Sequence, residues 1–251
     1  MTQRFTDKVA VLTGAASGMG RATSLRLAGE GAAVVGLDVN GEGLDETAAM
    51  VADLDGTFAG RLTDVRRRQE CHDAIADVVA DHGRVDILGN IAGVSTSQHF
   101  TDVTEDQYGL MMGVNVDGMF WLCQAAMPSI LESNGTIINI ASNAGIMGQA
   151  YTVAYCTSKG AVVNFTRALA MEYVKENVRI NAIAPGGVKT PMTTNFDLPE
   201  GIDFALMQPY MGYRDMAEPG DIANVFAFLA SNEAANVHGA IWSADNGLVA
   251  G

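Results

Sequence analysis

The chain has 251 residues, of which 48% are hydrophobic and 18% charged, so it holds enough apolar sequence for one large core. Its 15 Lys and Arg residues are outnumbered by 29 Asp and Glu residues, which gives a formal charge of −14. Such an acidic surface would repel a phosphate backbone, which argues against nucleic acid as a partner.

The cysteine and histidine residues indicate neither a disulfide framework nor a metal centre. Three Cys is an odd number without metal-ligand or redox spacing, and the four His form no pair at metal-ligand spacing. No stretch approaches the roughly 18 apolar residues of a membrane span, and the N-terminal apolar run is too short for a signal peptide. We therefore expect a cytoplasmic protein with no metal and no membrane partner.

Short apolar runs rich in β-branched residues alternate with helical patterns along the chain. The predicted strands cover residues 8–13, 32–37, 85–88, 136–141, 178–184 and 240–245, with a weaker one near 57–62. They are mostly continuous apolar runs, as expected for strands covered on both faces. The alternation predicts parallel βαβ units, and hence an α/β fold with a doubly wound sheet of about seven strands and helices on both faces.

Helix signals and one long interruption complete the pattern. Thr104 and Gln107 form a capping box at a helix start, and an apolar stripe at helical spacing follows Pro219. The segment from about 189 to 219 is long, polar and interrupted by prolines. So long a segment in a compact domain is typical of a functional lid or a disordered loop.

The first predicted strand is followed by TGAASGMG, whose glycines are Gly14, Gly18 and Gly20. A chain this rich in glycine gives roughly 0.3 chance matches to such a spacing, so the motif alone is weak. Its position between a strand and a helix is where a pyrophosphate would meet the free N–H groups of a helix N-terminus. We therefore favour dinucleotide binding over a plain tight turn.

Asp38 ends the second strand, roughly 20 residues after the glycines. A carboxylate there can accept hydrogen bonds from both hydroxyls of an adenosine ribose. It would repel a 2′-phosphate by several kcal/mol even at an effective dielectric of about 20, and neither Val39 nor Asn40 offers a positive charge. The sequence therefore favours NAD over NADP, with a simple turn former as the alternative reading of Asp38.

Tyr155 and Lys159 lie four residues apart in a stretch that reads as an amphipathic helix, so their side chains start on the same face. Ionising a free Tyr at pH 7 costs about 4 kcal/mol, and a neighbouring ammonium group reduces that cost. The pair is either a catalytic acid/base with its cation or a half-buried phenol beside a solvated ammonium group. Ser142, at the carboxyl end of a predicted strand, favours the first interpretation because catalytic groups of parallel sheets gather at that edge.

Further motifs accompany these residues in a fixed order. They are TGAASGMG, Asn90-Ile91-Ala92-Gly93, Asn115 in VNVDG, Ser142, Tyr155-x-x-x-Lys159 and PGGVKT (185–190). In content and order the set resembles the classical short-chain dehydrogenase/reductase family, from about Asp7 to Gly247. The resemblance implies a single Rossmann-type domain, residues 1–251, that uses a nicotinamide cofactor to interconvert alcohols and carbonyls.

The resemblance also implies catalytic roles for four residues. Tyr155 would be the general acid/base, and Lys159 would lower the pKa of Tyr155 and bind the nicotinamide ribose. Ser142 would orient the substrate oxygen, and Asn115 would hold a water molecule in a proton relay. From the residues alone, Asn115 would be an ordinary polar residue within a helix.

A larger set of residues would bind the cofactor if the resemblance holds. Asp64 and Val65 would contact adenine, and the carboxamide would be held by Val188 and Thr190. The remaining contacts would come from Gly14, Ser17, Gly18, Met19, Gly20, Asp38, Asn90, Ala92, Gly93, Tyr155, Lys159, Pro185 and Gly186, with Asn90 and Gly93 along the cofactor.

The sequence departs from the family pattern at two positions. Ile91 replaces a usual Asn, which removes a polar group and leaves open how that turn is hydrogen-bonded. Ala141 stands where a second Ser is common. Neither change affects the residues expected to perform the chemistry.

The 189–219 segment is rich in Met and aromatic side chains, namely Met192, Phe196, Phe204, Met207, Tyr210, Met211, Tyr213 and Met216. Such side chains suit an adaptable apolar substrate pocket, or they pack the segment onto the body or a neighbouring subunit. Basic side chains are few there, so a highly anionic substrate is not expected. We expect a secondary alcohol or ketone of apolar bulk.

Several alternatives to an NAD-dependent alcohol dehydrogenase are weighed against the same residues. A sugar-nucleotide epimerase would carry an added substrate domain, and an enoyl reductase would place Tyr and Lys further apart. An NADP-dependent ketoreductase of the same family is one competing prediction, and a non-catalytic regulator that senses dinucleotides is another. An intact set of Ser142, Tyr155 and Lys159 argues against the regulator. The resemblance also suggests a homotetramer.

Overall fold

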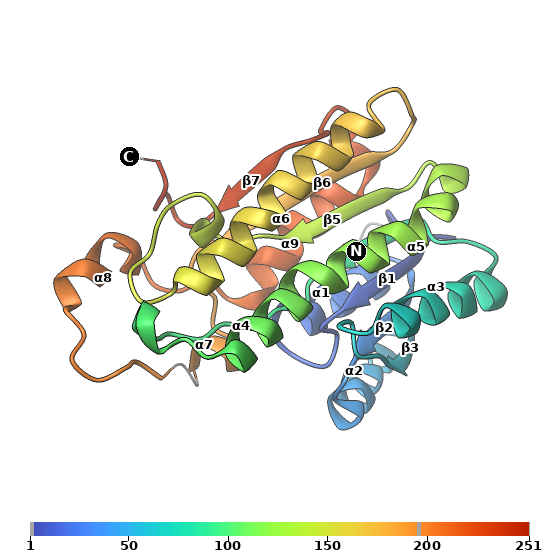
Figure 1. The fold of residues 1–251 in the computed structure, drawn as a ribbon. Helices are drawn as coiled ribbons and strands as arrows, with labels where there is room; N and C mark the ends of the chain where they lie inside the picture. The colour runs from blue at the N-terminus through green and yellow to red at the C-terminus, as the bar shows by residue number, and fades with distance from the viewer. Residues whose placement is uncertain (1–2, 195–196, 251) are drawn as a thin grey trace.

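A parallel sheet forms the centre of the computed structural model, which describes residues 3–194 and 197–250 (Figure 1). Its strands are β1 (Val9–Thr13), β2 (Ala33–Asp38), β3 (Thr57–Leu62), β4 (Ile87–Asn90), β5 (Thr136–Ile140), β6 (Arg179–Pro185) and β7 (Ile241–Ala244). Their spatial order is β3-β2-β1-β4-β5-β6-β7. The chain reverses direction across the sheet between β1 and β4, which opens a crevice at the carboxyl ends of these strands. The predicted doubly wound, single-domain α/β fold is confirmed.

Helices cover both faces of the sheet (Figure 1). One face carries α1 (Gly18–Ala28), α2 (Gly41–Ala52) and α9 (Pro219–Ala230), and the other carries α3 (Arg68–His82), α5 (Gly118–Ser133) and α6 (Val153–Glu172). α4 (Glu105–Met112) precedes α5, while α7 (Pro191–Thr194) and α8 (Phe204–Met211) follow β6. Short turns of helix are η1 (Phe100–Asp102), η2 (Gly113–Asp117), η3 (Asn143–Gly145) and η4 (Asn232–Ala234). Each face of the sheet therefore has its own apolar core, with Phe226 buried in one and Leu122 in the other.

Two strands differ in an instructive way from the apolar runs that predicted them. The strand expected at 85–88 lies two residues later, because β4 ends in Gly89 and Asn90, which an apolar-run criterion passes over. A Cβ atom at Gly89 would lie 2.5 Å from Leu12 Cδ2, so packing requires glycine there. The weak signal at 57–62 belongs to β3, an edge strand whose side chains are largely exposed.

The helical stretch from α4 to α5 is interrupted by η2, a π-helical turn that contains Asn115. The predicted capping box of Thr104 and Gln107 opens α4, with both of its hydrogen bonds present. π turns within α-helices occur frequently at functional sites. The sequence predicted only that Asn115 lies within a helix, and the structure shows that this part of the helix is a wider π turn.

The 189–219 segment leaves and rejoins the body at the same point. The Lys189 N–H donates to the Ala217 carbonyl, and the Ala217 N–H donates to the Gly187 carbonyl, both at 2.9 Å. Between these bonds the chain forms α7 and α8, and α8 projects beyond the sheet (Figure 1). Among the Met and aromatic side chains of the segment, Met207 is buried and Phe204, Met211, Tyr213 and Met216 are exposed, while Phe196 lies outside the described residues.

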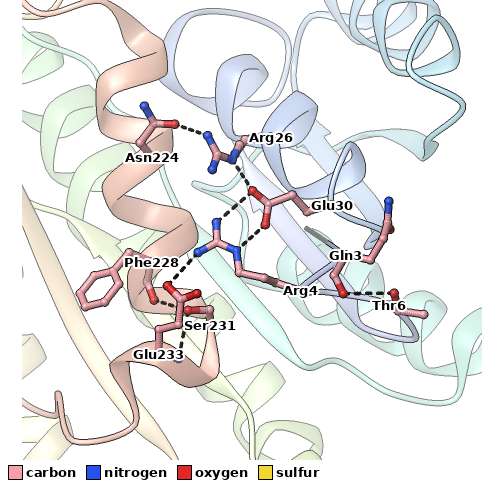
Figure 2. A network of polar contacts seen from close by, with 9 residues as sticks. All are labelled: Gln3, Arg4, Thr6, Arg26, Glu30, Asn224, Phe228, Ser231 and Glu233. Atoms are coloured by element: carbon pink, nitrogen blue, oxygen red, sulfur yellow. Dashed lines mark hydrogen bonds and ion pairs between the residues drawn. The ribbon is translucent and has the colours of Figure 1, made fainter. Parts of the chain in front are cut away.

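The N-terminal segment is fastened to two helices through one buried carboxylate (Figure 2). Glu30 is 1% exposed and accepts two hydrogen bonds from Arg4, at 2.5 and 2.9 Å, and another from Arg26. Arg4 also reaches Glu233 at 3.3 Å, next to the end of α9. Burial alone would raise the pKa of Glu30, but the two guanidinium groups outweigh it and lower the pKa below its ordinary value.

Candidate active site

The glycine loop between β1 and α1 has a backbone that only glycine accommodates. Gly14 and Gly18 have φ angles of 67° and 51°, in the left-handed region. A Cβ atom at Gly20 would lie 2.0 Å from the Gly14 carbonyl oxygen, so no other residue fits there. Ser17 precedes α1 without capping it through its side chain, which leaves the first N–H groups of the helix free to bind an anion.

This loop forms one wall of a cavity of about 420 Å³ at the carboxyl ends of the strands. Of the predicted cofactor-binding residues, those that line the cavity are Gly14, Ser17, Gly18, Met19, Gly20, Asp38, Asp64, Val65, Ala92, Gly93 and Thr190. The cavity combines left-handed glycines, free helix N–H groups and a carboxylate at the end of β2. These features fit a dinucleotide, with its pyrophosphate at the start of α1.

Asp38 is held in a fixed orientation at the end of β2. One of its oxygens accepts a hydrogen bond from the Ala16 N–H at 3.1 Å, and the other accepts one from the Asn40 N–H at 3.0 Å. The carboxylate thus links the glycine loop to the start of α2 and borders the cavity. It can accept further hydrogen bonds there, since each carboxylate oxygen has more than one lone pair.

Asn90 is placed differently from the expectation that it lies along the cofactor. Its side chain points into the core, where Nδ2 donates to Asn139 Oδ1 at 2.8 Å and to Cys123 Sγ at 3.2 Å. The turn that follows is hydrogen-bonded by Thr13, whose Oγ1 accepts from the N–H groups of Ile91 and Ala92 at 2.8 and 2.9 Å. The side chain of Ile91 is buried and apolar, and Thr13 bonds the N–H groups of this turn at Ile91 and Ala92.

Lys159 and Tyr155 lie about one turn apart on α6, with Lys159 close to Gly93 of the cavity wall. Lys159 is 3% exposed; its Nζ lies 5.8 Å from the centre of the Tyr155 ring and donates to the Ile140 carbonyl at 2.8 Å. Burial lowers the pKa of Lys159 to about 8. A Cβ atom at Gly93, which lines the cavity, would lie 3.5 Å from this Nζ and 3.3 Å from Asn115 Oδ1. Gly93 of the cavity wall therefore adjoins these two polar side chains, while Asn115, Ser142, Tyr155 and Lys159 do not themselves line the cavity.

Tyr155 is half-buried, and burial raises its pKa, with a smaller opposite effect from the Ser142 hydroxyl and a further increase from Cys156. The family resemblance implies that Lys159 lowers this pKa, but in the chain without ligands Lys159 is not among the causes of the shift. Ser142 follows β5 and caps η3, accepting from the Ala144 N–H and donating to Asn143 Oδ1, both at 3.1 Å. Ser142 is thus held close to the Tyr155 side chain.

Asn115 braces the loop after β4 against α6. Its Oδ1 accepts from the Val94 N–H at 2.8 Å, and its Nδ2 donates to the Val94 carbonyl at 2.9 Å and to Ser158 Oγ at 3.0 Å. Ser158 Oγ in turn donates to the Tyr155 carbonyl at 2.8 Å. Asn115 is therefore coupled to the catalytic candidates by position, while its role in a water relay stays a prediction.

The loop after β6 closes the opposite wall of the cavity. Thr190 lies against the glycine loop, since a Cβ atom at Gly18 would meet Thr190 Cγ2 at 3.1 Å. Pro185, Gly186 and Val188 lie behind this wall: Val188 is buried, and the Gly186 N–H donates to the Ala244 carbonyl. None of these three residues lines the cavity, so the predicted cofactor contacts of Pro185 and Gly186, and the predicted carboxamide contact of Val188, stay predictions.

Three tyrosine and histidine contacts fasten the segment around α8 to the body. The Tyr151 hydroxyl accepts from the Asp203 N–H at 2.8 Å, and the Tyr210 hydroxyl donates to the Ala150 carbonyl at 2.7 Å. His99 packs edge-on against Tyr151 and bonds to the Glu200 carbonyl at 2.8 Å. Tyr151 has a φ of 64°, a strained conformation for a bulky residue that recurs at functional sites.

Some residues at the site carry no signal in the sequence. Thr13 reads as the last residue of a strand and Ser158 as a helix residue. Arg66, Leu110 and Val114 line the cavity because the fold brings their elements to it; Met192, named above for its place in the Met-rich segment, lines it as well. Among the described residues, no cluster of His, Cys, Asp and Glu could hold a metal ion, and no helix is long and apolar enough to cross a membrane.

Known proteins share both the sequence and the fold of this chain. The family model described as short chain dehydrogenase matches residues 8–201. Meso-2,3-butanediol dehydrogenase of Serratia marcescens is 37% identical, with 98% of this chain and 96% of that protein covered. The 3-oxoacyl-[acyl-carrier-protein] reductase of Thermotoga maritima is 36% identical, with 98% and 99% covered. A short chain dehydrogenase from Mycobacterium paratuberculosis, crystallised with NAD, superposes with a TM-score of 0.90 at 31% identity and covers 98% of each chain. With its Rossmann-like fold and these relatives, the chain belongs to the short-chain dehydrogenase/reductase family of oxidoreductases.

Proposed function

We propose that this protein is an NAD-dependent dehydrogenase that interconverts a secondary alcohol and a ketone. The observation that carries the proposal is the contact between the cavity wall and a polar cluster at Gly93. Lys159 and Asn115 lie directly behind this glycine, next to the space that would hold the nicotinamide end of the cofactor. A binding module without chemistry would have no use for a buried lysine beside a tyrosine.

Tyr155 is the proposed general acid/base. In the oxidative direction its phenolate would take the hydroxyl proton of the alcohol, and in the reductive direction its phenol would return that proton to the carbonyl oxygen. The bound nicotinamide ring would accept or supply the hydride. Ser142 would donate a hydrogen bond to the substrate oxygen, and the Lys159 ammonium group would favour the phenolate. Because burial raises the pKa of Tyr155, oxidation should be faster at alkaline pH.

Asp38 is the basis for proposing NAD over NADP. Its carboxylate is fixed by two backbone N–H groups and borders the cavity, where it can accept the hydroxyls of an adenosine ribose. A 2′-phosphate at the same place would meet a negative charge at close range. The dehydrogenase from Mycobacterium paratuberculosis with bound NAD supports this choice.

The substrate is proposed to be an uncharged secondary alcohol or its ketone. A relative named for meso-2,3-butanediol, a secondary alcohol, supports this class. Lys189 is paired with Glu218 at 2.5 Å, which reduces its attraction for an anionic substrate. Association into a homotetramer, in the cytoplasm, also stays our proposal from the family resemblance.

The test is the appearance of reduced nicotinamide at alkaline pH when the protein is mixed with NAD and a panel of secondary alcohols. We expect turnover by the wild type and a loss of at least about 100-fold in Tyr155→Phe, which removes only the hydroxyl. Tyr108→Phe, at an exposed position on α4, is the matched control and should retain full activity. Equal rates for Tyr155→Phe and the wild type would refute the mechanism.

A further inference from the structure

Arg66 borders the end of the cavity where adenine is expected, and it has no role in the proposed mechanism. It lines the cavity together with Asp64, Leu110 and Val114, and it follows directly the two residues that the family resemblance places at the adenine. The side chain is 48% exposed, so part of its surface faces the open space. A positively charged, half-exposed group in this position can contact a bound ring directly.

The guanidinium group of Arg66 is held in place at both ends of its side chain. Nε donates to Asp64 Oδ1 at 2.9 Å and Nη2 donates to Asp64 Oδ2 at 2.6 Å, which is a two-pronged pairing in one plane. The Arg66 N–H also donates to Asp64 Oδ1 at 3.1 Å. The aliphatic stem lies against Gly113, where a Cβ atom would come within 3.2 Å of Arg66 Cγ. The orientation of the guanidinium plane is therefore set before any ligand binds.

A fixed guanidinium plane favours one kind of ligand group. Its charge is already compensated by Asp64, so a further anion gains less from it than from a free arginine. Its flat face is weakly hydrated and stacks on aromatic rings. Arg66 holds the pKa of Asp64 below its ordinary value, so the pair stays ionised at neutral pH.

We propose that Arg66 contacts the adenine ring of the bound dinucleotide with its guanidinium face, while Asp64 fixes the plane of that face. The inference rests on the proposed function in one respect, namely that the cavity binds an adenine dinucleotide. The proposal gives Arg66 a part in binding the adenosine half of the dinucleotide. Neither the family motifs nor the position of Arg66 in the sequence indicates this role.

Calorimetric titration with ADP-ribose tests the proposal, because this ligand carries the adenosine half and needs no turnover. We expect Arg66→Ala to weaken binding of ADP-ribose and NAD by about three- to tenfold. Arg66→Lys should weaken binding to the same extent, since it keeps the charge but loses the plane. Arg67→Ala is the matched control: Arg67 reaches the same Asp64 at 3.7 Å, is 71% exposed and is not among the cavity-lining residues. Its affinity should equal that of the wild type.

The outcomes separate this inference from the proposed function. Equal affinity of Arg66→Ala, Arg67→Ala and wild type for ADP-ribose would overturn the inference and leave the proposed function intact. A loss confined to NADP and 2′-phospho-ADP-ribose would also overturn it, because Arg66 would then be a phosphate ligand. A wild type that binds neither ADP-ribose nor NAD would overturn the proposed function, and the inference with it. Thermal unfolding of each variant confirms that the titrated protein is folded.

Discussion

The buried charge of Lys159 lowers the folding stability of the protein. Its ammonium group is buried, with the Ile140 carbonyl as a hydrogen-bond partner, and burial lowers its pKa to about 8. At neutral pH the side chain is therefore charged in the folded protein at the expense of folding free energy. The cavity side of this group faces Gly93, where a bound ribose would supply further partners.

Lys159→Met should make the protein more stable and inactive at the same time. The folded pKa of about 8 lies below the ordinary value of 10.5, so the unfolded chain binds more protons between these two values. The free energy of unfolding of the wild type therefore rises with pH across this window, and the advantage of the variant, up to about 3 kcal/mol at pH 7, disappears by about pH 10.5. Urea unfolding at both pH values measures this, with the exposed Lys175→Met as control. A variant that is less stable than the wild type at pH 7 would contradict the prediction.

Asp38→Asn should relax the choice between NAD and NADP. The substitution keeps the shape of the side chain and removes its charge, so repulsion of a 2′-phosphate falls while the hydrogen bonds to the ribose hydroxyls weaken. We expect the ratio of kcat/KM for NADP over NAD to rise by at least about tenfold. Steady-state rates with NADP and with NAD measure this ratio. The control Asp45→Asn, on the exposed side of α2, should leave the ratio unchanged. An unchanged ratio in Asp38→Asn would remove the argument for NAD.

The sequence predicted residues whose role follows from their place at a strand end. Asp38 and Ser142 could be identified because each follows a clear apolar run, and a parallel sheet brings such ends together. Thr13 could not, because its partner is the turn after β4, which only the folded chain brings near. Arg66 pairs locally with Asp64, but its place at the cavity, against Gly113 of η2, depends on the fold. The direction of the Asn90 side chain was equally hidden, since its neighbours Asn139 and Cys123 are distant in sequence.

Helices and strands were predicted best where one periodicity is continuous. The stripe after Pro219 is α9, with Ile222, Phe226 and Leu229 buried. The π turn of η2 has no periodic signal, because one widened turn shifts the apolar face by too little to show in a short window. The late end of β4 was missed for a different reason, namely that a tight contact there demands glycine rather than an apolar side chain.

Removal of the Tyr151 hydroxyl should loosen the segment around α8 from the body of the protein. Tyr151→Phe removes the bond to the Asp203 N–H but keeps the ring against His99. Loss of one hydrogen bond of about 1 kcal/mol should raise the population of the opened segment about fivefold. Limited proteolysis between residues 197 and 213 measures this population, and Tyr213→Phe, at a fully exposed position, is the control. Cleavage at the wild-type rate in Tyr151→Phe would show that the hydroxyl does not hold the segment.

On the scale of the whole molecule, the Glu30 carboxylate joins Arg4 of the N-terminal segment to Arg26 of α1, and the two arginines also reach Glu233 and Asn224 at α9 and just beyond it. Glu30→Gln leaves Arg4 and Arg26 without their common anion, which should lower the free energy of unfolding by about 3 kcal/mol at pH 7. Because the folded pKa of Glu30 is lowered, its contribution is present above the ordinary value of 4.5 and is lost as the pH falls through the folded value.

Unfolding curves measured from pH 7 down to about pH 3 should therefore converge for the wild type and Glu30→Gln. The exposed Glu42→Gln serves as the control for removing a negative charge from this acidic protein, and it should follow the wild type throughout. A constant difference between the wild type and Glu30→Gln over the whole range would show that the carboxylate contributes through shape rather than charge.

The paired backbone bonds at Lys189 and Ala217 also have an evolutionary consequence. Because the segment between them begins and ends at one point, its length and sequence can change without shifting β6 or α9. A lineage can then change this one stretch while the sheet, the cavity and α6 stay as they are. Relatives that are 36% and 37% identical to this chain but carry names as different as an acyl-carrier-protein reductase and a butanediol dehydrogenase are what such exchange would leave behind.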